Sequence, residues 1–210
     1  MKIELENVLP EDIERRSFEI IEGELPHPLE TELAPIIKRV IHTTADFDYA
    51  DSLYFSENAV SFALEALRAG ATIVTDTNMA KAGVNKPALA KLGGEVLCFM
   101  ADADIAAAAK ENGTTRAAAA MEKAARLRGP LIFAVGNAPT ALVRLYELIG
   151  EGKTSPALII GVPVGFVNVV QAKELIMKTS VPCIVARGRK GGSNVAAAIV
   201  NALMYKVTRR

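Results

Sequence analysis

Residues 131–140 are LIFAVGNAPT, an unbroken apolar run followed by glycine, asparagine and proline. A strand buried on both faces of a parallel sheet has this continuous apolar pattern, and proline is favoured in the first turn of a following helix. The same pattern recurs at residues 71–75, 95–99, 157–160 and 182–186. Helical patterns separate these runs, at about 102–127 with a break near Gly113, 138–149, 168–178 and 193–206. The alternation predicts an α/β fold with a doubly wound, mostly parallel sheet of five strands.

The apolar residues of the N-terminal third, about residues 10–69, recur at helical spacing and predict helices that pack on this sheet. A first helix starts near Pro10, and a second occupies about residues 31–44. A third helix follows Ser56, a residue type that often caps helices. The sequence shows no repeat and no linker. We therefore expect one domain over residues 1–210, with helices at about 10–69 and alternating strands and helices at about 71–206.

Composition excludes several classes of function. The chain has 24 Lys and Arg against 24 Asp and Glu, so no global field favours a nucleic acid or an anionic membrane. The uncharged stretch 154–172 is interrupted by prolines and glycines, so we expect no membrane span. Cys98 and Cys183 lie in apolar runs, as buried thiols of a cytoplasmic protein would. Spaced Cys and His pairs are missing, so we expect no metal site.

The predicted loops at the carboxyl ends of the strands carry the polar residues suited to a ligand site. In open parallel sheets, ligands bind outside these strand ends, and the loops there concentrate glycine, asparagine and basic residues. The candidate ligand-binding residues from these loops are Asp76, Asn78, Asn137, Thr140, Val164, Gly165, Arg187, Arg189, Lys190, Gly191, Gly192 and Ser193.

The loop 187–194 has the composition of an anion site, because three cations precede the N–H groups of a helix N-terminus. A tight solvated turn is the alternative. Nucleotide-binding glycine motifs are absent. Arg116 follows two threonines that can cap a helix, and a cation in the first turn opposes the helix dipole. A bound anion would remove that conflict, whereas an arginine extended into water is the simpler explanation.

His42 is the histidine with a setting suited to catalysis. It falls near the C-terminal end of the second helix, where the dipole favours the protonated imidazole, and it projects away from the apolar stripe. A solvated surface histidine and a catalytic acid both fit this pattern. Ser17 interrupts the apolar stripe of the first helix. Its hydroxyl either bonds its own helix backbone or contacts a ligand.

Seven short segments, taken in order, resemble the precorrin-8X methylmutase family, also called cobalt-precorrin-8 methylmutases, of corrin biosynthesis. The segments are IERRSF at 13–18, RVIH at 39–42, DTNM at 76–79, TRAA at 115–118, GNAPTAL at 136–142, GVPVGFV at 161–167 and RGRKGGS at 187–193. The resemblance implies an isomerase that moves a methyl group from ring carbon eleven to ring carbon twelve of a ring-contracted tetrapyrrole. It also implies His42 as proton donor and acceptor, substrate contacts from Ser17 and Arg39, and a homodimer.

The residues fit such a substrate, a flat macrocycle fringed with carboxylates. Local cation clusters would hold the carboxylates, and the apolar loop 162–166 would cover a face of the ring. A methyl shift within one molecule requires no cofactor. Two alternatives remain: an α/β enzyme acting on a phosphorylated metabolite through loop 187–194, and a tetrapyrrole-binding protein without catalysis.

Overall fold

The computed structural model describes residues 6–208. One domain over residues 1–210 stays a prediction, and its outermost residues, 1–5 and 209–210, lie outside the described part. A short turn, η1 (Pro10–Asp12), precedes the helices α1 (Ile13–Glu24), α2 (Ala34–Thr44), α3 (Tyr49–Ser52), α4 (Ala59–Arg68), α5 (Asn78–Gly83), α6 (Lys86–Ala90), α7 (Ala103–Glu111), α8 (Arg116–Ala124), α9 (Pro139–Gly150), α10 (Val169–Met177) and α11 (Ser193–Thr208). The strands are β1 (Leu53–Phe55), β2 (Thr72–Thr75), β3 (Glu95–Leu97), β4 (Leu131–Val135), β5 (Leu158–Gly161) and β6 (Cys183–Ala186).

The strands form one sheet of six strands in the order β1-β6-β5-β4-β2-β3, so the predicted number of five is wrong. The five predicted strands are present and parallel. The additional strand, β1, lies in the third of the chain predicted to be helical and pairs antiparallel with β6. Ser56 does not cap α4, because its Oγ accepts the Cys183 N–H at 2.8 Å. A strand of three residues has too little pattern of its own, and β6 supplies its hydrogen bonds.

Side chains of the strands alternate between two apolar cores, one on each face of the sheet. Ile73 and Ile132 belong to the core that includes residues of α2, α4 and α11. Val74 and Phe133 belong to the core formed with α8, α9 and α10. Both faces are therefore covered by helices, which explains why the strands are continuously apolar. The doubly wound order of the crossovers stays a prediction.

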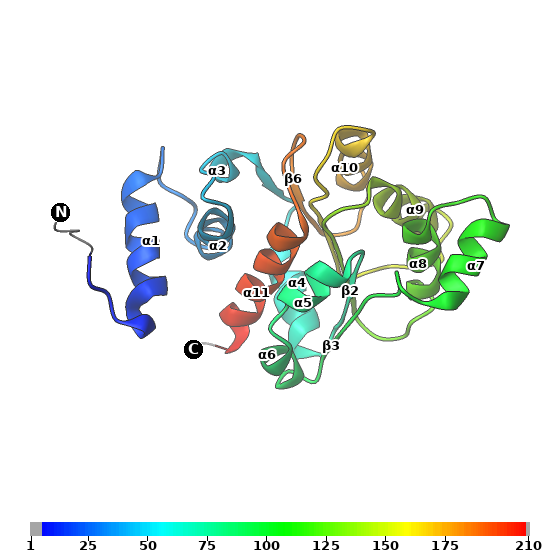
Figure 1. Cartoon of the computed structure of the whole chain (residues 1–210), viewed down its shortest axis with the longest axis horizontal. Coiled ribbons are helices and arrows are strands. Elements are labelled where there is room, and N and C mark those ends of the chain that lie inside the picture. Colours follow the sequence, from blue (N-terminus) through cyan, green and yellow to red (C-terminus); the bar gives the residue numbers. More distant parts are fainter. Residues whose placement is uncertain (1–5, 209–210) are drawn as a thin grey trace, which may run out of the picture.

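The N-terminal helix lies farthest from the sheet. Figure 1 shows α1 in blue at one end of the molecule, with α2 between it and the red helix α11. Two ion pairs join α1 to α2: Glu14 with Arg39, and Glu22 with Lys38. On α1, Ile21 is buried, whereas Ile13 and Ile20 are 52% and 41% exposed. The helix thus keeps an apolar surface facing outward.

Local capping explains several boundaries. The predicted break near Gly113 is confirmed: α7 ends at Glu111, and Gly113 adopts a φ of 59°. Thr115 then caps α8, because its Oγ1 accepts the Ala118 N–H at 3.1 Å. The short helices α5 and α6 were not predicted, although Thr77 and Asn85 cap them in the same way.

Within residues 6–208, no helix has the length and apolar character that crossing a membrane requires. The uncharged stretch 154–172 forms β5, a loop and the start of α10. Cys98 and Cys183 are both buried and unpaired, as predicted.

Candidate active site

Asp76 lies beneath the carboxyl edge of the sheet and holds the loop after β4. Its carboxylate is fully buried and accepts N–H groups from Gly136 and Asn137 at 2.8 Å and from Ala138 at 2.6 Å. Burial raises the pKa of the Asp76 carboxyl, and the three N–H donors oppose that rise. Asp76 was predicted to bind a ligand. Because both oxygens face inward and are engaged, we assign it to positioning this loop instead.

The loops that follow four strands pack against one another at this edge. A Cβ on Gly136 would lie 2.7 Å from Ser193 Cα, so the loop after β4 touches the start of α11. Ser193 Oγ also hydrogen-bonds Thr77 Oγ1, after β2, at 2.7 Å. The Gly192 N–H donates to Val162 O, after β5, at 2.9 Å. Gly192 and Ser193 are buried in this contact, and their predicted part in ligand binding stays a prediction.

The adjacent glycine, Gly191, is required by the same contact. Its φ is 157°, and a Cβ there would collide with the Val162 carbonyl. Only glycine fits without moving the backbone. Gly165, also a predicted ligand contact, donates its N–H to Arg189 O at 3.2 Å. The loops after β5 and β6 are therefore tied together, and both lie at the predicted ligand edge.

Two arginines of the basic loop lie over aromatic rings. The guanidinium carbon of Arg187 is 4.8 Å from the centre of the Tyr54 ring, and that of Arg189 is 5.5 Å from the centre of the Phe166 ring. Both arginine side chains are exposed. Stacking on a ring restricts a guanidinium without using its N–H donors. Arg187 and Arg189 are therefore oriented cations that can still bind a carboxylate.

Lys190 has a different setting from the two arginines. Its Nζ lies 2.7 Å from Asp46 Oδ2 and 2.6 Å from Asp48 Oδ2. Donation of hydrogen bonds to these carboxylates raises the pKa of Lys190, and the same contact lowers the pKa of Asp46. Asp46 follows α2 by two residues, so Lys190 joins the end of β6 to the helix that carries His42. In this structure Lys190 links two parts of the site, and its predicted contact with a ligand stays a prediction.

Four further predicted residues are exposed at the same edge. They are Asn78 at the start of α5, Arg116 at the start of α8, Asn137 after β4 and Thr140 in the first turn of α9. Thr140 Oγ1 lies 2.9 Å from Oγ1 of Thr115, the cap of α8, so the starts of α8 and α9 are neighbours. Arg116 occupies the first helical position, as predicted.

Exposed apolar side chains lie beside these polar groups. Val164, Phe166 and Val167, after β5, are 48%, 81% and 77% exposed. Met79, which follows β2 at the same edge, is 73% exposed. Val164 was among the predicted ligand contacts. Met79 and Val167 were not, and neither was the aromatic partner Tyr54, because β1 itself was not predicted. Exposed apolar side chains grouped at a ligand edge suit a flat apolar molecular face.

His42 lines a pocket of about 230 Å³ at the end of α2. Its ring is exposed and meets the edge of the Phe18 ring at right angles, with 5.6 Å between centroids. Ser17 lines the same pocket, and its Oγ donates to Ile13 O at 2.7 Å. This hydrogen bond to the helix backbone is one of the two alternatives that the sequence allowed for the Ser17 hydroxyl. The pocket is lined by Ser17, Ile20, Ile21, Glu24, Ile41, His42, Ala45 and Phe47.

Arg39 does not line the His42 pocket. Its two terminal nitrogens donate to the Glu14 carboxylate at 3.1 and 2.8 Å. Its guanidinium also lies between the rings of Phe18 and Tyr205, 5.0 and 5.1 Å from their centres. A substrate carboxylate would have to replace Glu14 at this guanidinium. The contact of Arg39 with a substrate, implied by the family resemblance, stays a prediction.

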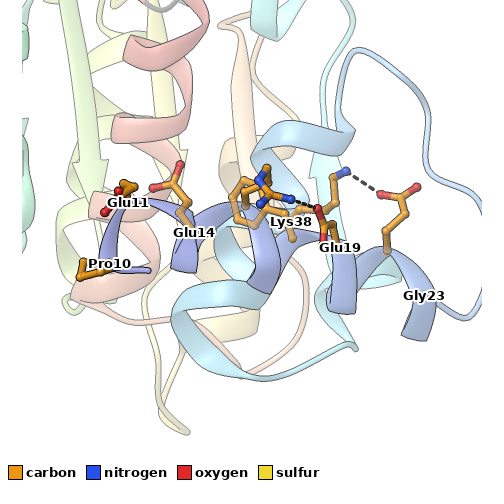
Figure 2. Close-up of a pocket in the computed structure, with 9 residues that line it drawn as sticks. Pro10, Glu11, Glu14, Glu19, Gly23 and Lys38 are labelled. Carbon is orange, nitrogen blue, oxygen red and sulfur yellow. Dashed lines mark hydrogen bonds and ion pairs between the residues drawn. The ribbon is translucent and has the colours of Figure 1, made fainter. Parts of the chain in front are cut away.

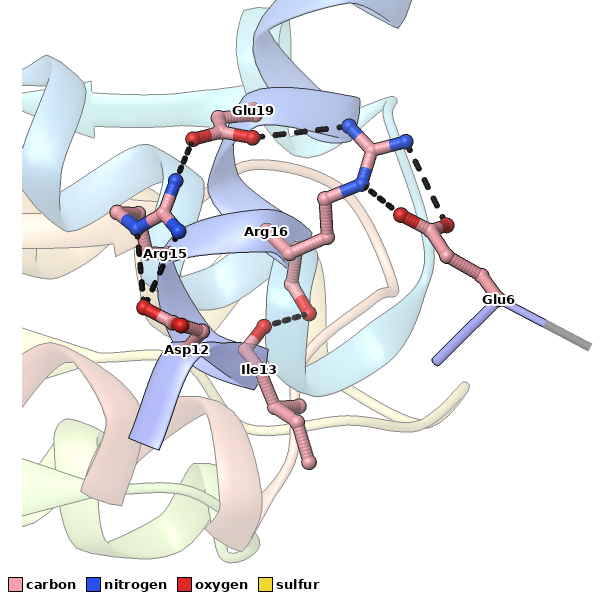
Figure 3. Close-up of polar contacts among 7 residues, drawn as sticks. Glu6, Asp12, Ile13, Arg15, Arg16 and Glu19 are labelled. Atoms are coloured by element: carbon pink, nitrogen blue, oxygen red, sulfur yellow. Dashed lines mark hydrogen bonds and ion pairs between the residues drawn. The ribbon is translucent and has the colours of Figure 1, made fainter. Parts of the chain in front are cut away.

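A pocket larger than that of His42 has a mainly acidic lining, which disfavours an anionic ligand. It measures about 1140 Å³ and lies along α1 beside Lys38 of α2 (Figure 2). Its lining includes the carboxylates of Glu11, Glu14, Glu19 and Glu22. The basic residues of α1 are engaged with carboxylates, as Figure 3 shows for Arg15 with Asp12 and Glu19 and for Arg16 with Glu6 and Glu19. We therefore place the candidate site at the carboxyl edge of the sheet and at the pocket that His42 lines.

Across residues 6–208, no group of three His, Cys, Asp or Glu side chains is arranged to hold a metal ion. Oriented arginines and exposed apolar loops lie at the carboxyl edge of a parallel sheet, and Lys190 joins this edge to the segment that follows the His42 helix. This arrangement is typical of an α/β enzyme for an organic anion with flat apolar faces.

Comparison with known proteins identifies the family. The chain belongs to the precorrin-8X methylmutase family, whose model matches residues 12–206. It is 46% identical over 197 residues to a cobalt-precorrin-8 methylmutase of Priestia megaterium, covering 93% of this chain and 88% of the relative. It is 42% identical over 195 residues to a precorrin-8X methylmutase of Pseudomonas aeruginosa, covering 91% and 93%. A crystal structure of the precorrin-8X methylmutase from Thermus thermophilus superimposes with a TM-score of 0.87 at 42% identity, covering 95% of this chain and 97% of that one.

Proposed function

We propose that this chain isomerises precorrin-8X or cobalt-precorrin-8 by moving a methyl group from ring carbon eleven to ring carbon twelve. The product is hydrogenobyrinate or cobyrinate, in cobalamin biosynthesis. The observation that carries the proposal is the connection of the His42 pocket to the arginine-bearing loop through Lys190 and Asp46. This connection supports the proposal that His42 transfers a proton to a ring whose carboxylates are bound by the cations of that loop.

His42 is the proton donor and acceptor in this proposal. Protonation makes the conjugated ring more electron-poor and eases migration of the methyl group, and the proton returns to the imidazole afterwards. A positioned acid typically accelerates a reaction by about 10²–10⁴-fold. The ring of His42 is exposed and lines a pocket, which supports its contact with an incoming ligand.

The carboxylate arms and the ring faces are bound by different residues. Arg187, Arg189 and Arg116 take the arms through charge-assisted hydrogen bonds. Asn78, Asn137 and Thr140 add polar contacts, and the apolar side chains of Val164, Phe166 and Met79 lie against the ring. The methyl group moves within one molecule, so the reaction requires no cofactor.

A homodimer completes the site in this proposal. The His42 pocket of about 230 Å³ is smaller than the roughly 300–1,000 Å³ that usually encloses an organic ligand. Ile13 and Ile20 on the N-terminal helix are 52% and 41% exposed, and Leu9, just before η1, is 60% exposed. A second copy would cover these side chains and enlarge the pocket. The two buried thiols support a reducing cytoplasm as the location.

The direct test is turnover by the purified chain, starting from substrate. We expect the absorption spectrum of precorrin-8X or cobalt-precorrin-8 to change with time while the mass stays constant, and a carbon-13 label to show the methyl group on carbon twelve. Tight binding with a constant spectrum would instead indicate a tetrapyrrole-binding protein. Binding of sugar phosphates in preference to corrinoid carboxylates would indicate an enzyme of phosphorylated metabolites. Either result would overturn the proposal.

A further inference from the structure

Lys173, on α10, is a buried lysine that lies beneath the basic loop. It is 1% exposed, and its neighbours on the inner face of the helix, Val169, Ala172 and Ile176, are buried apolar residues. Its Nζ donates to Gly188 O and to Lys190 O, each at 2.8 Å. Among residues 6–208, the hydrogen-bond partners of this amino group are therefore two backbone carbonyls of one loop.

Burying this amino group is unfavourable in itself. Taking a charged group out of water costs several kcal/mol unless it is paired. Burial accordingly lowers the pKa of Lys173 to about 8. An apolar side chain would continue the inner face of α10 without this cost. We therefore relate the presence of Lys173 to the loop carbonyls of Gly188 and Lys190 that it binds.

Its contacts fix the direction of the loop's peptide groups. In each trans peptide the N–H lies antiparallel to the C=O. The carbonyls of residues 188 and 190 point inward to Lys173, and that of residue 189 accepts the Gly165 N–H at 3.2 Å. The N–H groups of residues 189, 190 and 191 must then point away from these contacts. N–H groups that point outward from a loop and have no acceptor in the protein can donate to an anion.

We propose that Lys173 is a positioning residue that holds the loop 187–191 with its N–H groups and its two stacked arginines directed at a substrate carboxylate. The inference rests on the proposed function, because it assigns the loop to a carboxylate arm of that substrate. Lys190, bonded to Asp46 and Asp48, holds the same loop from the side of α2. The two lysines then act as supports, and Arg187 and Arg189 as ligand-binding groups.

The test replaces the amino group with an apolar side chain of similar length, Lys173→Met. The control is Lys178→Met, because Lys178 is an exposed lysine at the end of the same helix. We expect Lys173→Met to raise KM about tenfold, the loss of roughly one charge-assisted hydrogen bond, with kcat within about twofold. Hydrogen exchange of the Gly165 N–H, which donates to Arg189 O in this loop, should accelerate by at least about tenfold while β4 stays protected. Lys178→Met should change neither quantity.

Each other outcome overturns the inference. Unchanged exchange in Lys173→Met would show that the loop is held without the amino group, and a fall in kcat at constant KM would place Lys173 in the chemical step. If Lys173→Met does not fold, Lys173→Gln keeps a donor on a shorter side chain, and the same changes should appear in smaller size. Absence of turnover in the wild-type chain would overturn the proposed function instead. The hydrogen-exchange rate of the Gly165 N–H and the affinity for the polycarboxylate uroporphyrin, each compared between Lys173→Met and wild type, would then still decide the role of Lys173.

Discussion

Replacing Asp76 with alanine removes the acceptor for three backbone N–H groups at once. These bonds are 2.8, 2.8 and 2.6 Å long, and each hydrogen bond to a charged group contributes about 1.5–3 kcal/mol. Gly136 is buried, so its N–H would lose its partner entirely. Asn137 is exposed and Ala138 half-buried, so water can replace the carboxylate at their N–H groups. We therefore expect a loss of roughly 3–5 kcal/mol in the free energy of unfolding, below the simple sum.

The measurement is thermal and urea unfolding of Asp76→Ala beside Asp76→Asn and Asn78→Ala. For a chain of this length, about 2–4 °C of Tm is lost per kcal/mol, so Asp76→Ala should lower Tm by about 6–20 °C. Asp76→Asn keeps one oxygen acceptor and should lose roughly half as much. Asn78 is exposed, and its replacement should leave Tm within about 2 °C. Wild-type stability of Asp76→Ala combined with a raised KM would refute the reasoning, because Asp76 would then be a ligand contact.

Three further predictions concern the same edge of the sheet. Gly136→Ala should destabilise the fold by about 1–3 kcal/mol, because its Cβ would lie 2.7 Å from Ser193 Cα. Gly150→Ala, with open space around its Cβ, should leave stability unchanged. The measurement is the urea midpoint of unfolding of each variant. Arg189→Ala should raise KM about tenfold in steady-state kinetics, while Arg128→Ala, exposed before the amino end of β4, should leave KM unchanged. The pKa of Lys173 is lowered from 10.5 to about 8 in the folded state. Between these two pH values the unfolded chain therefore binds more protons than the folded chain. The free energy of unfolding should rise with pH across that interval by up to about 3 kcal/mol relative to Lys173→Met. A flat difference between the two proteins over that interval would contradict the burial of a titrating amino group.

The strand positions and the ligand edge were predictable because their signals are local. Each parallel strand has a continuous apolar run, and the break between α7 and α8 follows from Gly113 and the cap at Thr115. The polar loops followed from topology alone, since parallel strands place their carboxyl ends at one edge. Local sequence therefore indicated where the site lies.

The partners of the site residues were not predictable, because they come from distant segments. The inward direction of Asp76 depends on a loop 60 residues away in sequence. Lys190 meets Asp48 across 142 residues, and β1 forms only because β6 offers it an edge. The sequence alone does not distinguish Lys173 from an exposed helical lysine, because its buried partners belong to the loop after β6. Composition of a loop predicts the kind of ligand, whereas packing decides which side chains are free to bind it.

The most direct measurement of the central claim is single-turnover conversion of the substrate by His42→Ala, with dissociation constants measured in parallel. The account predicts that the rate falls by at least about 10²-fold while substrate affinity stays within a fewfold of wild type, because the arginine loop and the apolar edge still bind the ring. Wild-type conversion by this variant, with its fold intact, would contradict the assignment of His42 as the group that transfers the proton.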